Sequence, residues 1–343
     1  MTLFIVRRIA IAIPVLFGVT LITFLLMHFT AGNYVPGLTG NPRLTGADLA
    51  RIRAELGLNR PIPAQYLDWV GVGAILKPLG LTAVLGGGNI DTGVLEGNFG
   101  RSLIDGSPVL TILADRLPNT IELTGTALLL GLVLAIPIGV LSALYRGSWL
   151  DNALTTLSVA GFAIPEFWFC LLVILVFSVI LHDHGLPSLP SDGATSALGG
   201  GGLVDRLAHL ILPASVLAFY YFALWSRFVR SSMIEVISQD YIRTARAKGL
   251  SENRVVFIHA LRNALASLIT LIGLELPDLV GGSLVVEVVF NWPGVGLLTY
   301  QRALAYDYTT VMGITIFVAL SVIAGNLLAD VLYGIVDPRV RYA

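Results

Sequence analysis

No lysine in this chain stands in a sequence that could form a phosphate-binding loop. Such a loop needs Gly-Lys followed by Ser or Thr, whereas Lys77 is followed by Pro and Lys248 by Gly. The Gly-x-Ser-x-Gly elbow of serine hydrolases and the His-Glu-x-x-His helix of zinc proteases are also absent from the sequence. We therefore expect no catalytic residues, no ATP hydrolysis by the chain alone, and no cofactor bound by this chain.

Residues that could bind a metal ion are sparse. His182 and His184 could share an ion from one loop, but two solvated histidines are the simpler interpretation. The only cysteine, Cys170, lies in an apolar run, which excludes a disulfide framework and a cysteine-based metal site. We expect no metal site.

The segment 239–251 concentrates charge between two apolar runs. It reads Gln-Asp-Tyr-Ile-Arg-Thr-Ala-Arg-Ala-Lys-Gly-Leu-Ser, which is compatible with a helix except at Gly249. A glycine there favours a sharp turn with positive φ. Two functions fit these residues equally well. A soluble partner protein could hold the short helix and its turn, or a basic loop could be attracted to anionic lipid.

Long apolar runs must position these residues. Of the 343 residues, 55% are hydrophobic and 13% are charged, compared with about 25% charged in a soluble domain. A bilayer core about 30 Å thick requires roughly 20 apolar residues per helix. We predict an all-α integral membrane protein with six transmembrane helices, at 9–29, 120–145, 153–181, 207–228, 258–289 and 309–336. The first run is longer than a signal-peptide core, so we expect it to stay uncleaved.

The distribution of Arg and Lys predicts the orientation. In short loops these residues mark the cytoplasmic side. They precede the first span, follow the sixth, and occupy the links between spans two and three and between spans four and five. The links after spans three and five hold only Arg206 and Arg302. We predict that both termini lie in the cytoplasm and that the chain crosses the membrane several times.

The segment 30–118 is predicted to form an extracytoplasmic insertion between the first two spans. Thr45 and Asp48 fit the start of a helix that Gly57 would end, and 61–69 reads as a second short helix. Residues 79–95 fit either a hairpin or a flexible Gly-rich loop. We divide the chain into 1–29 (N-terminus and first span), 30–118 (insertion) and 119–343 (five-helix core with a cytoplasmic loop at about 235–255).

Several motifs resemble those of one transporter family. The run at 239–250, followed by His-Ala-Leu-Arg-Asn-Ala at 259–264, resembles the ATPase-docking loop of binding-protein-dependent ABC importer permeases. It is most similar to the oligopeptide/dipeptide branch. Further resembling runs are Asn-Phe-Gly-Arg-Ser at 98–102, Gly-Ser-Trp-Leu-Asp at 147–151 and Trp-Pro-Gly-Val-Gly at 292–296. The resemblance covers nearly the whole chain.

Two departures from the family pattern lie in the segment 30–118. The family usually has Pro-Gly-Asp-Pro after the first span, whereas this chain has Ala-Gly-Asn-Tyr at 31–34. A long Gly-rich stretch also separates Trp69 from Asn98. These departures put the substrate and the docking of a binding protein in doubt, but not the transporter class.

The resemblance implies an ABC-importer permease core of the MetI-like fold, a place in the inner membrane of a bacterial or archaeal cell, and a function in the uptake of di- and oligopeptides. The chain would assemble with a second homologous permease subunit, two ABC ATPase subunits and an extracytoplasmic substrate-binding protein, surrounded by membrane lipid. The partner ATPases would bind ATP and Mg²⁺ and drive alternating access of the pore. Nothing suggests nucleic acid as a partner. The residues implied in ATPase docking and coupling are Asp240, Tyr241, Arg243, Thr244, Ala245, Ala247, Lys248 and Gly249.

The fifth predicted span contains two carboxylates. Glu275 and Asp278 would share one helix face, which Gly282 continues. Carboxylates in hydrocarbon are costly and usually face a cavity or a partner. Our hypothesis is that this face lines the translocation pathway and favours substrates with positive charge. The alternatives are pairing with the partner permease, or a position in water at the outer mouth.

Other functions remain open at this point. The same transporter type also serves nickel, glutathione or oligosaccharides. A secondary transporter driven by an ion gradient would need carboxylates inside the membrane, for which the candidates are Glu122, Glu166, Glu275, Asp278 and Asp330. It often has repeated halves with broken helices, whereas the sequence shows no internal repeat. It would also have no need of the turn at Gly249.

Overall fold

The computed structural model describes residues 2–31, 59–72, 93–196, 201–276 and 278–336. Regular structure within these ranges is helical, and the one pairing of extended backbone there is an isolated bridge between Arg101 and Pro108. The predicted all-α class is therefore confirmed. The helix predicted between Thr45 and Gly57 lies outside the described residues, and so does most of the segment 79–95 that was predicted as a hairpin or a flexible loop.

Four of the described helical segments are long and apolar enough to cross a membrane: Val109–Leu144, Glu166–Asp183, Leu203–Ile237 and Tyr308–Ala329. The first helix, α1 (Thr2–Ala31), holds a shorter apolar stretch at Ala10–Leu26. These segments confirm an integral membrane protein, while the count of six spans stays a prediction.

The chain divides into two compact units. The larger unit comprises Pro118–Leu297 and the residues from Ala324 onward, and the smaller unit comprises Thr2–Leu117 and Leu298–Ile323. Three helices pass from one unit to the other: α5 (Val109–Leu144), α15 (Val295–Leu304) and α16 (Tyr308–Val336).

In the smaller unit, α1 packs against α3 (Ile62–Val70). This helix matches the short helix predicted at 61–69. Its Tyr66 is buried, with its hydroxyl 2.8 Å from the Thr20 hydroxyl and its ring 5.4 Å from that of Phe24. An aromatic residue whose polar tip has a partner can anchor a short helix in this way.

A buried carboxylate organises the other end of the smaller unit. Asp307 is fully buried and accepts hydrogen bonds from the Ser102 hydroxyl at 2.6 Å, the Leu103 N–H at 3.0 Å and the Thr310 hydroxyl at 2.7 Å. Arg302 contributes a charged donor at 3.3 Å. Because a buried charge requires paired donors, these contacts fix the loop that precedes α5 against the start of α16.

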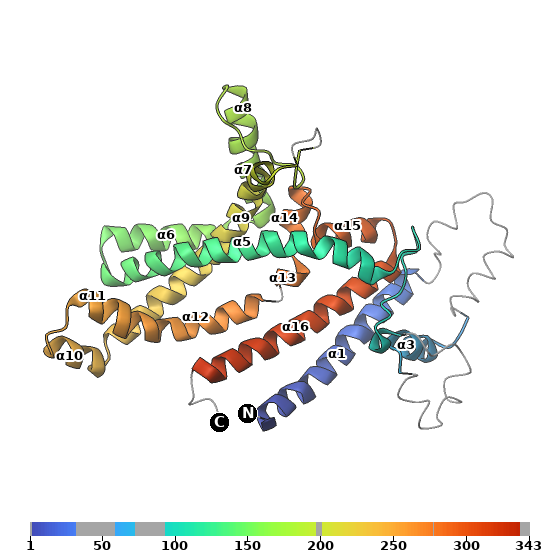
Figure 1. Cartoon of the computed structure of the whole chain (residues 1–343), viewed down its shortest axis with the longest axis horizontal. Coiled ribbons are helices and arrows are strands. Elements are labelled where there is room, and N and C mark those ends of the chain that lie inside the picture. Colours follow the sequence, from blue (N-terminus) through green and yellow to red (C-terminus); the bar gives the residue numbers. More distant parts are fainter. Residues whose placement is uncertain (1, 32–58, 73–92, 197–200, 277, 337–343) are drawn as a thin grey trace. The chain divides into compact units, whose positions relative to one another are not determined.

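In the larger unit, α9 (Leu203–Ile237) lies at the centre. Fifteen of its residues are buried, and α6 (Trp149–Ala163), α7 (Glu166–Ile174), α12 (Leu261–Glu275) and α14 (Leu284–Val289) pack against it. Figure 1 shows α6 beside α9. At 35 residues, α9 is about 52 Å long at 1.5 Å per residue. It therefore extends beyond a hydrocarbon core of about 30 Å unless it is strongly tilted.

The prediction of one continuous third span at 153–181 is wrong. α6 ends at Ala163, and α7 begins after Pro165, which has no N–H to continue the helix. The break leaves the carbonyl of Ile164 without a helical donor, and the Tyr220 hydroxyl donates to it at 2.6 Å. α7 then continues through a π-helical turn, η3 (Leu175–Ile180), into α8 (Leu181–Asp183).

The fifth predicted span, 258–289, is also interrupted. α11 (Glu252–Arg254) precedes this span, and a second π-helical turn, η4 (Val255–Ala260), contains its start and leads into α12. α12 ends at Glu275, and the short helices α13 (Asp278–Gly281) and α14 follow. A proline at 277 removes a helical donor, and Gly282 has a φ of +70°, which ends α13.

Candidate functional site

The charged segment after α9 forms a helix and a turn. α9 ends at Ile237, Ser238 and Gln239 follow, and α10 spans Asp240–Ala247. Asp240 stands in the first turn of α10, where a negative charge favours the helix dipole. The predicted helix at this place is confirmed.

The predicted turn at Gly249 is also present. Gly249 has a φ of +74°, and its N–H donates to the Arg246 carbonyl at 2.9 Å. The Leu250 N–H reaches back to the Ala245 carbonyl at 3.4 Å, which completes a six-to-one closure of the helix end. A Cβ added at Gly249 would meet no atom within 4 Å. The requirement for glycine is therefore conformational and not steric.

An ion pair spans this turn. Arg246, in the last turn of α10, contacts Glu252 at the start of α11 at 2.6 Å. The guanidinium lowers the pKa of the Glu252 carboxyl below its usual range. Both side chains are exposed, so the pair adds little stability, but it links the two helices across the turn.

Two side chains fix α10 to the rest of the larger unit. Ile242 is fully buried and Ala245 is 7% exposed, and both belong to the hydrophobic core that includes Val255 and Val256 of η4. Ala245 was predicted among the docking residues, but its side chain faces inward and supports α10.

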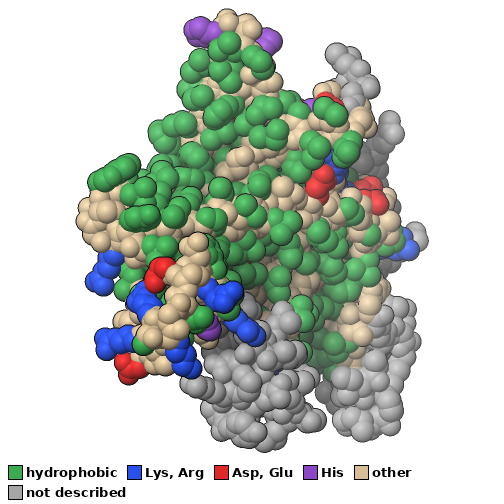
Figure 2. All heavy atoms as spheres, turned by 60° about the vertical axis from the view of Figure 1, so that its left-hand side comes forward, with side chains coloured by type: hydrophobic (Ala, Val, Ile, Leu, Met, Phe, Trp, Pro, Cys, Tyr) green, Lys and Arg blue, Asp and Glu red, His purple; other side chains and the backbone are tan. Residues whose placement is uncertain are grey.

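The opposite face of α10 is open. Tyr241 is 45% exposed, and its exposed neighbours on α10 are polar. The other predicted docking residues are exposed with it: Asp240, Arg243, Thr244, Ala247, Lys248 and Gly249. In Figure 2, Lys and Arg side chains gather over α10 and α11, whereas hydrophobic side chains cover the adjoining flank. The segment therefore presents a rigid, basic and partly aromatic surface.

The predicted pathway residues are arranged differently from the prediction. Glu275 is the last residue of α12 and Asp278 the first of α13, so they do not share the face of one continuous helix. Their carboxyl groups nevertheless lie close enough to interact electrostatically. Gly282 does not continue their face. It caps α13 and lies against the buried Glu287 and Thr120.

A third carboxylate lies near this pair. Glu166, at the start of α7, interacts electrostatically with Asp278 and accepts a hydrogen bond from the Ser283 hydroxyl at 3.1 Å. The sequence analysis named Glu166 only as one of five carboxylates that could lie inside the membrane. Its proximity to Asp278 could not be anticipated, because it depends on the break at Pro165. Asp278 is exposed and Glu275 half-buried in the isolated chain, so this carboxylate group can face a partner or a water-filled space.

Of the two remaining charged candidates, the side chain of Asp330 lies outside the described residues, and Glu122 has a structural partner. Glu122 is ion-paired with Arg206, whose guanidinium also lies 5.6 Å from the Trp292 ring centroid. The described residues contain no group of three or more metal-ligating side chains. His182 and His184 are exposed, in keeping with the simpler interpretation of these residues.

Comparison with known proteins identifies close relatives along the whole chain. A family model for binding-protein-dependent transport system inner membrane components matches residues 135–342, and a model for the N-terminal part of such components matches residues 1–124. The oligopeptide transport system permease protein AppB of Bacillus subtilis is 41% identical over 100% of both chains. The dipeptide transport system permease protein DppB of Escherichia coli is 36% identical over 99% of this chain and 98% of its own.

The fold is also similar to that of solved transporter structures. One of them is an inward-facing form of the MetNI methionine ABC transporter, with a TM-score of 0.52 and 21% identity over 66% of this chain and 97% of the other. The likeness supports the predicted core fold.

Proposed function

The chain belongs to the family of binding-protein-dependent transport system inner membrane components, and from this premise we propose that it is a permease subunit of an ATP-driven importer of di- and oligopeptides. The observation that carries the proposal is the full-length similarity to proteins named as oligopeptide and dipeptide permeases. The sequence has no phosphate-binding loop, which agrees with a subunit that relies on separate ATPases.

In this proposal, α10 is the ATPase-docking element. Its exposed residues form the contact surface, while Ile242 and Ala245 hold the helix in the core. The importer comprises this chain, a second homologous permease, two ABC ATPases that bind ATP and Mg²⁺, and an extracytoplasmic binding protein. Closure of the ATPases would shift α10 and bias the permease pair between inward- and outward-facing states.

The carboxylates at the α12–α13 break are proposed to face the translocation pathway. Glu275, Asp278 and Glu166 bring three carboxyl groups close to one another in the larger unit. Buried or membrane-embedded carboxylates are costly unless they have a function or a partner. Here they would attract the ammonium group of a peptide. We further propose that both termini lie in the cytoplasm, in line with the distribution of Arg and Lys.

Reconstitution tests the function directly. The chain would be expressed with the ATPase, permease and binding-protein genes beside its own, and the complex placed in vesicles containing ATP on the ATPase side. We expect uptake of a labelled tripeptide that requires ATP and the binding protein. A complex with inactivated ATPases is the control. Uptake of only nickel, glutathione or an oligosaccharide would refute the peptide assignment, and uptake driven by an ion gradient without ATP would refute the transporter type.

A further inference from the structure

A bidentate ion pair joins α6 to α9. Asp151, in the first turn of α6, accepts hydrogen bonds from Nε of Arg230 at 2.7 Å and from Nη2 at 2.8 Å. Its carboxylate also accepts from the Ser142 hydroxyl of α5 and from the Gly147 N–H at 2.9 Å. Asp151 is buried, and the Arg230 guanidinium lowers the pKa of its carboxyl below the usual range. Three helices therefore meet at one charged group.

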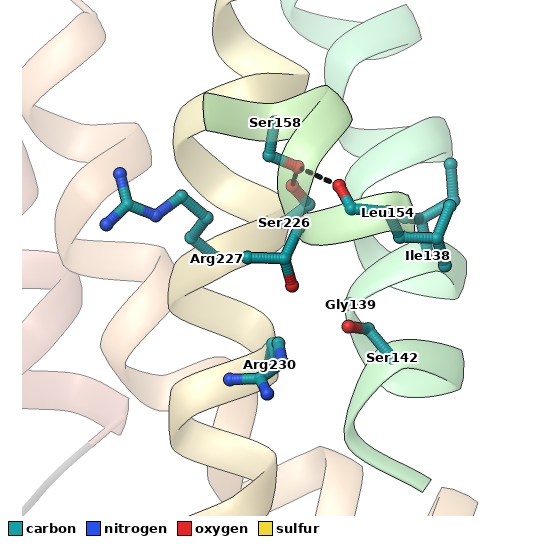
Figure 3. A pocket seen from close by; sticks show the side chains of 9 residues that line it. Ile138, Gly139, Ser142, Leu154, Ser158, Ser226, Arg227 and Arg230 are labelled. Atoms are coloured by element: carbon teal, nitrogen blue, oxygen red, sulfur yellow. Dashed lines mark hydrogen bonds between the residues drawn. The ribbon is translucent and has the colours of Figure 1, made fainter. Parts of the chain in front are cut away.

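The same helices are also in close contact just before Arg230 on α9. The hydroxyls of Ser158 on α6 and Ser226 on α9 lie 2.9 Å apart, and both residues are buried. A Cβ added at Gly139 of α5 would come within 2.6 Å of Val229 on α9, so the two backbones can approach this closely only because of the glycine. The hollow left among these residues is about 10 Å³, room for at most one water molecule. Figure 3 shows the serines and Arg230 around it.

The two ends of α10 are attached in different ways. Ser238, directly after α9, keeps right-handed helical dihedral angles, and the Gln239 N–H still bonds the Val236 carbonyl at 3.1 Å. At its other end, α10 passes through the left-handed turn at Gly249 and then the wide turn η4 before α12 begins. Gln239 has extended backbone, with φ of −72° and ψ of 149°, so a two-residue turn separates α9 from α10, whereas the attachment to α12 runs through the left-handed turn and η4.

We propose that Asp151 and Arg230 are positioning residues that hold α5, α6 and α9 together as one rigid lever, which carries α10 through the two-residue turn at Ser238 and Gln239. The inference rests on the proposed function, because the lever would carry the motion of the ATPases. Asp151 and Arg230 act through α9 and contact neither ATP nor substrate.

A disulfide between α6 and α9 tests whether the two helices move together. Ser158→Cys and Ser226→Cys would be combined in a Cys170→Ala background. A protease site inserted between residues 196 and 201 reports whether the disulfide has formed, because the two cleaved fragments stay joined only when the cysteines are oxidised. We expect the oxidised complex to keep ATP-driven uptake at the level of the reduced complex. Loss of uptake on oxidation, recovered with a reductant, would overturn the lever. Uptake by the reduced complex separately tests the proposed function.

Removal of the ion pair gives an independent test. In Asp151→Asn, we expect the amount of peptide taken up per ATP hydrolysed to fall several-fold, and oxidation of the Ser158→Cys and Ser226→Cys pair to restore it. Arg230→Gln is the second variant if Asp151→Asn assembles poorly. Arg227→Gln, an exposed arginine one turn earlier on α9, is the matched control and should keep normal coupling. The positioning role would be refuted if the disulfide leaves uptake unchanged when the ion pair is intact but restores coupling in neither Asp151→Asn nor Arg230→Gln.

Discussion

Gly249 allows a conformational effect to be separated from a steric one. An added Cβ has open space around it, yet the φ of +74° is costly for a β-branched residue, about 1–2 kcal/mol. We expect Gly249→Val to insert and assemble but to lose stimulation of ATP hydrolysis by the loaded binding protein. Gly249→Asn is the matched variant, because asparagine tolerates this region, and it should retain most stimulation. Equal activity in both variants would show that the turn is not needed for coupling.

Asp307 and Asp105 both contact Arg302, but their burial differs. Asp307 is fully buried with several donors, whereas Asp105 is an exposed residue 2.8 Å from Arg302. Removing a buried acceptor leaves its donors unsatisfied and can cost about 3 kcal/mol, while an exposed ion pair contributes about 1 kcal/mol at most. We expect Asp307→Ala to lower the melting temperature of the purified protein markedly and Asp105→Ala to change it little.

The same pair gives a prediction for pH. Arg302 lowers the pKa of Asp105 to about 2. Because the pKa of Asp105 is lower in the folded protein than in the unfolded chain, its ion pair stabilises the folded state at any pH above the unfolded-state pKa. This contribution is lost only as the pH falls toward 2. The Asp105 pair should therefore add no pH dependence to the melting temperature between pH 5 and 8. A difference between wild type and Asp105→Ala that changes across this range would contradict the assigned contact.

At the scale of elements, the break between α12 and α13 brings carboxylates together. If they line the pathway, Glu275→Gln combined with Asp278→Asn should reduce uptake of cationic peptides more than that of neutral or anionic ones. Size-exclusion chromatography would first establish that the complex assembles. The same fractional change for all three peptide classes would refute a pathway role, and failure to assemble would favour contacts with the partner permease.

The sequence predicted the elements whose signals are local. α10 and its turn follow from helix-forming residues ending at a glycine, and α3 follows from its position after Pro61. The breaks within the third and fifth spans were missed because hydropathy does not respond to a lost hydrogen bond, and prolines are common in membrane helices. Tertiary contacts were missed for a different reason. Nothing local pairs Asp151 with Arg230, which are 79 residues apart.

At the scale of the whole molecule, the proposed orientation places His184 and Ser251 on opposite sides of the membrane. Both are exposed in the larger unit. In a Cys170→Ala background, we expect His184→Cys to react with an impermeant thiol reagent in intact cells, and Ser251→Cys only after the membrane is permeabilised. The reverse pattern would overturn the orientation and the assignment of α10 as the ATPase-docking helix.

The π-helical turns bear on which insertions and deletions this chain can accept. In η3, the Leu181 N–H bonds the Val176 carbonyl five residues earlier, so the turn holds more residues than an α-turn. No η3 residue is buried as a whole. The hydroxyl oxygen of Ser178 is nevertheless shielded from solvent, and it has no hydrogen-bond partner among the described residues. Deleting Ser178 would let the segment close as ordinary α-helix. The same deletion within α9 would rotate every later residue by about 100° and turn Arg230 away from Asp151. Single-residue insertions and deletions among relatives should therefore occur at the π-helical turns η3 and η4 and be absent from α9.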